Sequence, residues 1–127
     1  MIHLDTNLLI GAEDTTDPHH LAARRVFAGS GPFGCSSVAW MELESQPGTP
    51  ALRAAMRGLL NGGIAPFDEA AATLAGNLYH LTGSKRRTRL DTMIAATAIL
   101  AGAWLATVNR EDFSIFVPHG LKLFALP

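Results

Sequence analysis

The sequence predicts an α/β fold: a short, mostly parallel central sheet with helices on both faces. Short apolar runs typical of buried strands alternate with longer segments of helical character, which is the order found in parallel α/β proteins. The 127 residues, 48% of them hydrophobic and 17% charged, fit one domain spanning residues 1–127. Capping residues and glycines mark the ends of several helical segments.

The N-terminal segment predicts one strand and two helices. Met1–Leu4 is a short apolar run that fits a buried strand, and the polar residues Asp5–Asn7 interrupt it. Leu8–Gly11 fits a brief helical turn ending on glycine. Pro18–Phe27 fits a helix, with Asp17 as its N-cap and proline at its first position.

A second strand and two further helices are expected before the middle of the chain. Phe33–Ser36 fits a short strand, and Ser37–Ser45 has helical character. Thr49–Asn61 predicts a helix more clearly, because threonine can cap it, proline follows the cap, and the glycine pair Gly62–Gly63 ends it.

The second half continues the alternation of strands and helices. Asp68–Thr82 fits a helix with an aspartate cap and a glycine stop, and the alanine-rich segment Asp91–Ala101 fits another. The remaining expected elements are three strands and a basic connector: Ile64–Pro66, Trp104–Val108, Leu121–Leu126 and Lys85–Arg89.

Charge and cysteine content narrow the class of protein. The net charge of −1 argues against a globally basic nucleic-acid binder but allows a local basic patch. The single cysteine, Cys35, lies in an apolar stretch and fits a core residue in a reducing compartment. We find neither a membrane-spanning apolar run nor a signal peptide, so we expect a cytoplasmic protein with no membrane partner.

Four carboxylates lie where predicted strands end or helices begin: Asp5, Glu42, Asp91 and Asp112. In a parallel sheet these points gather at the carboxyl edge, where ligands bind. Four acids gathered there would repel one another unless a cation joined them. We therefore expect a metal site, although each acid alone is about equally well explained by helix capping.

The glutamate segment leaves a choice open. Helical spacing puts Glu42 beside Val38, and Glu44 beside Trp40 and Met41. One of the two acids should face inward in this apolar context, but periodicity does not select it.

Four segments together resemble the PIN-domain family, and most closely its VapC-like toxin ribonucleases. They are Ile2–Asn7, Met41–Leu43, Asp91–Ala96 and Ala106–Phe113. The resemblance spans nearly the whole chain and selects Glu42 over Glu44. The sequence departs from the family pattern at Ala39, where threonine or serine is frequent, and in lacking a glycine shortly after the glutamate.

The resemblance implies a PIN-like three-layer sandwich whose catalytic set is Asp5, Glu42, Asp91 and Asp112. Asp5, Asp91 and Asp112 would bind metal, with Glu42 completing the acidic cage and Thr6 and Asn109 as supporting polar groups. Oxygen-only ligands suit Mg²⁺ or Mn²⁺. The implied reaction is metal-dependent hydrolysis of RNA, and the implied partners are a small antitoxin and a second copy of the chain in a homodimer.

A basic cluster precedes the third acid and consists of Lys85, Arg86, Arg87 and Arg89. It could hold the phosphates of a nucleic acid, or it could be a solvated loop.

Two other functions are compatible with these residues. One is a PIN-like module that binds nucleic acid or protein without cutting, which the departures around Glu42 allow. The other is an aspartyl-phosphate receiver or phosphatase using Asp5. The Asp5–Asn7 segment lacks the second aspartate two positions on that phosphatases of the haloacid dehalogenase type use.

Overall fold

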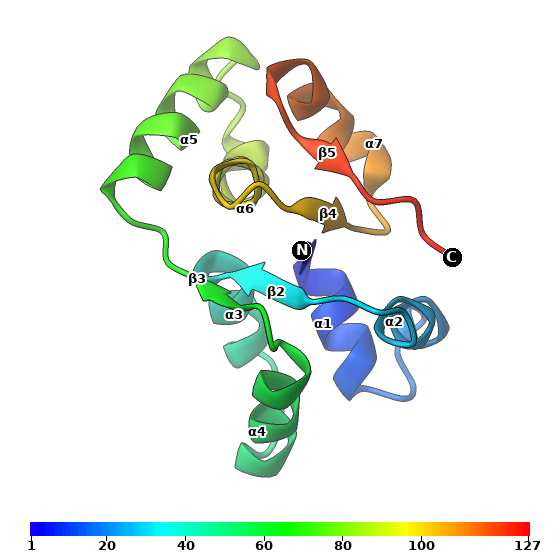
Figure 1. The fold of residues 1–127 in the computed structure, drawn as a ribbon. Helices are drawn as coiled ribbons and strands as arrows, with labels where there is room; N and C mark the ends of the chain where they lie inside the picture. Colours follow the sequence, from blue (N-terminus) through cyan, green and yellow to red (C-terminus); the bar gives the residue numbers. More distant parts are fainter.

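The computed structural model describes all residues from 1 to 127, and its centre is a five-stranded sheet in the order β3-β2-β1-β4-β5 (Figure 1). Every neighbouring pair of strands is parallel, which confirms the predicted α/β architecture. The last two strands of the chain are shorter than the sequence suggests, and the third begins and ends one residue earlier. The strands are β1 Ile2–Leu4, β2 Phe33–Ser36, β3 Gly63–Ala65, β4 Trp104–Ala106 and β5 Lys122–Leu123.

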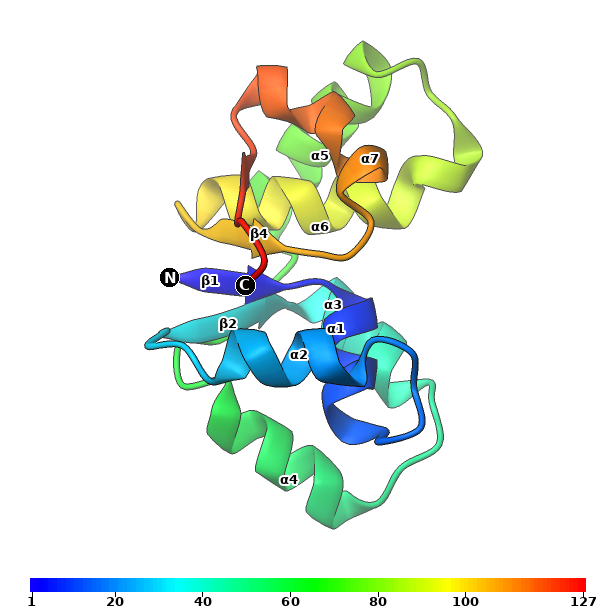
Figure 2. The same cartoon turned by 90° about the vertical axis from the view of Figure 1, so that its right-hand side faces the viewer.

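Helices cover both faces of the sheet. Helices α5 and α6 lie on one face and α1 and α2 on the other, while α3 packs against both α1 and α6 (Figures 1 and 2). The helices are α1 Thr6–Glu13, α2 His20–Phe27, α3 Ser37–Glu44, α4 Pro50–Leu59, α5 Glu69–Leu81, α6 Arg89–Leu100 and α7 Arg110–Phe113. Two 3₁₀ turns, Arg86–Thr88 and Ser114–His119, complete the chain.

Helix caps predicted from local chemistry are present at two of the clearest sites. The Thr49 hydroxyl accepts a hydrogen bond from the Leu52 N–H at 3.2 Å, at the start of α4. The Asp68 carboxylate accepts one from the Ala71 N–H at 3.0 Å, at the start of α5. These side chains satisfy amide groups that have no partner inside the helix, so short-range sequence sets both boundaries.

Three helix starts differ from the prediction. Helix α1 is a full helix rather than a brief turn, because the Asp5 side chain caps it directly. Helix α2 begins at His20 rather than Pro18. The Asp17 carboxylate accepts a hydrogen bond from the His19 N–H at 2.8 Å, in a turn that precedes the helix. Helix α6 begins at Arg89, two residues early, because the 3₁₀ turn before it leads straight into the helix.

The core lies on both sides of the central strands. Leu4, Leu105 and Ile94 are at most 1% exposed, and Cys35 is fully buried among them, as expected for a core cysteine. The alanine-rich helix α6 packs against β2 and β4, so its small residues bring the first turn of the helix close to the sheet. None of the helices has the length and hydrophobicity that crossing a bilayer requires.

Candidate active site

The four acids predicted from the sequence converge at the carboxyl edge of the sheet. Asp5 follows β1, Glu42 lies on α3, Asp91 is in the first turn of α6, and Asp112 is on α7. In Figure 2 the ends of β1 and β4 and the first turn of α6 all face the right-hand side. Burial and the negative charges of Asp5, Asp112 and Glu42 raise the pKa of Asp91 to about 6, so the other three acids all lie close enough to act on Asp91.

Asp5 is the most rigidly held of the four acids. It is 4% exposed. Its Oδ1 accepts from the Thr6 N–H at 2.8 Å, and its Oδ2 accepts from Thr107 Oγ1 at 2.7 Å and Asn7 Nδ2 at 3.0 Å. Burial raises the pKa of Asp5, and the Glu42 charge raises it further, against the opposing effect of these donors. The carboxylate therefore has a fixed orientation.

The structure separates the two glutamates of α3. Thr6 Oγ1 donates to Glu42 Oε1 at 2.7 Å, which places Glu42 beside the start of α1 and near Asp5. Glu44 lies instead 2.8 Å from Arg53 Nε, although that N–H does not point at the oxygen. Ala39 is fully buried in the core, and Glu42 acts by its charge on both Asp5 and Asp91 despite this departure from the family pattern.

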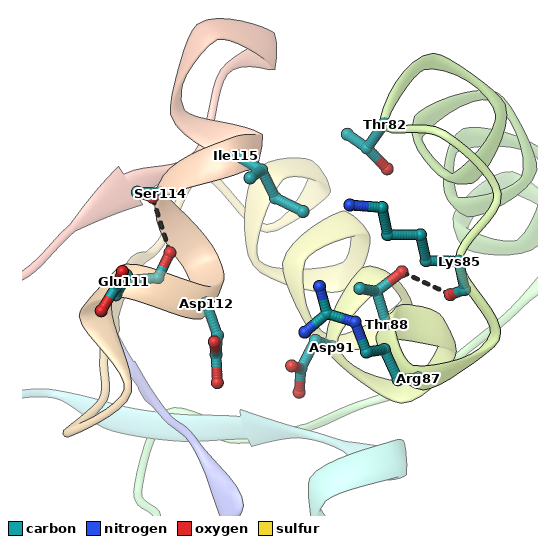
Figure 3. A pocket seen from close by; sticks show the side chains of 9 residues that line it. All are labelled: Thr82, Lys85, Arg87, Thr88, Asp91, Glu111, Asp112, Ser114 and Ile115. Atoms are coloured by element: carbon teal, nitrogen blue, oxygen red, sulfur yellow. Dashed lines mark hydrogen bonds between the residues drawn. The ribbon is translucent and has the colours of Figure 1, made fainter.

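Asp91 and Asp112 open into a cleft of about 570 Å³ (Figure 3). Their carboxylates point into the same space, and the Arg87 guanidinium extends beside Asp91. Lys85 reaches in from the same segment. Both cations are free of acid partners, because the only ion pairs in the molecule belong to Arg53. The lining residues are Thr82, Lys85, Arg87, Thr88, Asp91, Glu111, Asp112, Ser114 and Ile115.

The basic cluster is not a single surface. Lys85 and Arg87 line the acidic cleft, whereas Arg86 does not. The Arg89 guanidinium lies 5.9 Å from the centroid of the Tyr79 ring, at a different hollow.

A residue absent from the sequence prediction, Thr107, completes the first contacts around Asp5. It follows β4 directly, is fully buried, and donates to Asp5 while accepting from the Asn109 N–H at 3.0 Å. Asn109 itself is exposed, and its side chain makes no hydrogen bond. The sequence feature that could have indicated Thr107 is its position directly after β4, the strand that pairs with β1 and ends beside Asp5.

The donor set fits a hard, hydrated cation. No three Asp, Glu, His or Cys side chains come close enough to chelate an ion without other ligands. Mg²⁺ commonly uses one or two carboxylates and keeps several waters, so this spacing suits it. A cation would also relieve the repulsion that raises the pKa of Asp91. The set Asp5, Asp91 and Asp112 offers only oxygen ligands.

A comparison with models of protein families identifies the family of the chain. The model of the PIN domain matches residues 2–115, nearly the whole chain. The chain belongs to the PIN-domain family. This confirms the resemblance seen in the four sequence segments. A comparison with curated protein sequences gives no match.

Solved structures show the same PIN fold over almost the full chain. FitAcB from Neisseria gonorrhoeae superposes with a TM-score of 0.73 at 21% identity, covering 98% of this chain and 97% of the other. VapBC2 from Rickettsia felis, bound to a DNA fragment from their promoter, has a TM-score of 0.70 at 20% identity and full coverage of both chains. A toxin–antitoxin complex from Klebsiella pneumoniae has a TM-score of 0.68 at 25% identity, covering 90% and 91%.

Proposed function

We propose that this PIN-domain protein is a ribonuclease that hydrolyses RNA phosphodiester bonds with Mg²⁺ or Mn²⁺. The observation that carries the proposal is the meeting of four carboxylates beside two unpaired cations. Acids that raise the pKa of Asp91 favour a divalent ion, while Lys85 and Arg87 in the same cleft favour a phosphate backbone. A receiver or phosphatase using Asp5 alone would not need the other three acids.

In this proposal Asp5, Asp91 and Asp112 would hold the ion, either directly or through the waters that it keeps. When bound, it would activate water for attack on phosphorus and stabilise the charge of the leaving oxygen. Thr107 and Asn7 orient the Asp5 carboxylate through their hydrogen bonds.

The remaining residues have supporting roles. Thr6 holds Glu42, which supplies further negative charge at the edge of the site. Lys85 and Arg87 bind phosphates of the strand and fix its register. Below pH 6 a proton occupies Asp91 and competes with the cation, so metal affinity should fall in acidic solution.

The test is cleavage of single-stranded RNA by the purified protein after chelation and after return of Mg²⁺ or Mn²⁺. Asp5→Asn and Asp91→Asn each remove a proposed ligand with little change in volume. Glu69→Gln is the matched control, because Glu69 is an exposed acid on α5 outside the cleft. We expect cation-dependent cleavage in the wild type and the control only. Full activity in a folded Asp91→Asn protein would refute the proposal. Cleavage that continues at the same rate after the divalent cations are chelated would also refute it.

We also propose that the protein is the toxin of a toxin–antitoxin pair and forms a homodimer. The similar toxin–antitoxin complex from Klebsiella pneumoniae, and VapBC2 bound to promoter DNA, support the pairing with an antitoxin. The product of a neighbouring short reading frame should co-purify with the chain and stop RNA cleavage. Sedimentation of the free protein tests the dimer. A purified neighbour that neither binds nor inhibits would contradict the pairing.

A further inference from the structure

The first turn of α6 separates two different hollows. Thr88 and Asp91 line the acidic cleft, whereas Arg89, Thr92 and Met93 line a second hollow of about 290 Å³ between α5 and α6. Helical spacing explains the division, because residues three and four positions apart share one face. The basic cluster is therefore split, with two cations at the acids and one at the second hollow.

The second hollow, which we term the aromatic hollow, has a mainly apolar wall. Tyr79 and Phe67 provide aromatic rings and Met93 a flexible apolar side chain, and no acid lines it. The residues around it are Phe67, Ala72, Ala75, Gly76, Tyr79, Arg89, Thr92 and Met93. The acidic cleft, in contrast, has only one hydrophobic lining residue, Ile115.

Hydrogen bonds hold the Tyr79 ring and the backbone at Phe67 in place around the aromatic hollow. The Tyr79 hydroxyl donates to the Ser84 carbonyl at 2.8 Å, which fixes the ring against the loop after α5. The Phe67 N–H donates to Ser37 Oγ at 2.9 Å, at the start of α3. Since Arg89 shares the first turn of α6 with Asp91, the aromatic hollow lies beside the acidic cleft.

We propose that the aromatic hollow receives an unstacked base of the RNA strand whose phosphate lies at the acids. This rests on the proposed function. A flat ring suits the apolar wall and can stack on Tyr79, and the Arg89 guanidinium adds a contact to its face. Arg89 and Asp91 are two positions apart in the first turn of α6 and line neighbouring hollows, so a strand that crosses this turn can place a phosphate at the acids and a base in the aromatic hollow.

Charge favours a nucleic acid over an apolar protein segment as the occupant. Arg86, Arg87 and Arg89 follow one another within four positions, and none has an acid partner. A polyanion that spans the two hollows meets Arg89 at one and Arg87 at the other, whereas an uncharged segment gains nothing from them.

The test compares binding of base-bearing and partly abasic RNA. Fluorescent oligo(A), oligo(U) and oligo(C) are titrated with the full-length protein without divalent cations, beside versions in which alternate nucleotides lack a base. We expect the wild type to prefer the base-bearing strands by about tenfold. Tyr79→Ala and Arg89→Ala should reduce or abolish this preference, and Tyr79→Phe, which keeps the ring, should retain it.

Arg86→Ala is the matched control, because it removes the same charge from the same segment but lines neither hollow. It should weaken binding to all strands alike and leave the preference intact. Equal preference in wild type and Tyr79→Ala would overturn the proposal, as would a wild type with no preference. A Tyr79→Ala change that dissociates a dimer without altering the preference would also overturn it, by showing that a second copy covers the hollow.

The assay requires no cleavage, so its failure is distinct from failure of the nuclease proposal. Activity in Asp91→Asn would remove the nuclease proposal whatever the binding data show. Loss of base preference alone would leave the metal-dependent reaction standing and remove only the base site.

Discussion

Asp91→Asn should stabilise the metal-free protein at neutral pH even though it removes a proposed catalytic group. The Asp91 carboxylate is partly buried and repelled by Asp5, Asp112 and Glu42. Its charged form therefore opposes folding when no cation is present. Replacing it with the neutral, similarly sized asparagine removes that cost.

The size of the effect follows from the raised pKa of Asp91. A rise from 3.8 to about 6, at about 1.36 kcal/mol for each pH unit, corresponds to about 3 kcal/mol. Solvent screens a partly exposed charge, and the variant also loses a favourable interaction with the start of α6. We therefore expect a net gain of about 1 kcal/mol in the free energy of unfolding.

The pH dependence gives the prediction its sign. Below pH 3.8 Asp91 is protonated in both the folded and the unfolded chain, and the variant gains nothing. Between 3.8 and about 6 the folded protein keeps a proton that the unfolded chain releases, so wild-type stability falls as pH rises. The difference between variant and wild type should grow through this window and stay constant above pH 7.

Urea unfolding in chelator at a series of pH values measures this difference. Titrating groups far from Asp91 act equally on both proteins and cancel, whereas the neighbouring acids add to the difference because the variant no longer repels them. Added Mg²⁺ should stabilise the wild type and have little effect on the variant, because binding to the folded state alone raises stability. A variant that is less stable than the wild type at pH 8, or a difference that does not change between pH 4 and 7, would refute the proposed charge cluster.

Three further predictions concern groups outside the carboxylates. His3 is buried with neither ring nitrogen hydrogen-bonded and its pKa lowered to about 4, so stability should fall as pH drops from 6.5 to 4; His3→Leu should flatten this part of the unfolding curve. Arg53→Met leaves Glu13 buried without its cation and should cost about 3–5 kcal/mol in urea unfolding. Thr107→Val removes the 2.7 Å hydrogen bond to Asp5 and should raise the Mg²⁺ concentration for half-maximal cleavage about 10- to 100-fold; an unchanged requirement would contradict the positioning role.

Local chemistry was enough to predict most of the fold. Thr49 with the following proline, and Asp68, mark helix starts whose hydrogen bonds lie within three residues. The start of α6 was less accessible, because Thr88 makes no side-chain cap and the helix continues from a 3₁₀ turn. This error also hid which way Arg89 faces, since the face of a helical residue depends on where the helix begins.

The sequence predicted that the four acids lie together, but it predicted only some of the residues that hold them in position. Motif order identified Asp5 and Asp91, which strand ends and a helix start bring together. The sequence did not identify Thr107 as a site residue, because a threonine after an apolar run is equally typical of a buried strand. The role of Arg53 depends on its hydrogen bonds to Glu13, 40 positions earlier, and to the carbonyls of Leu43 and Gln46, 10 and 7 positions earlier. No local sequence pattern encodes this combination of contacts.

Arg53 explains how two of the acid-bearing helices stay together despite repulsion. Its guanidinium bonds Glu13 Oε1 at 2.5 Å, at the end of α1, and the Leu43 and Gln46 carbonyls at 2.6 and 2.8 Å, at the end of α3. These same helices bring the Asp5 and Glu42 charges together at the catalytic edge.

Attraction at Arg53 therefore opposes repulsion between the carboxylates, and the Thr6–Glu42 hydrogen bond joins the same two helices. A protein without Arg53 can relax by moving α3 away from α1, which lengthens that bond. When a cation is bound, the repulsion between the carboxylates is removed, so the loss of Arg53 should cost less stability. Mg²⁺ should consequently recover part of the stability that Arg53→Met removes, whereas a purely local packing defect at Arg53 would leave the loss the same with and without the ion.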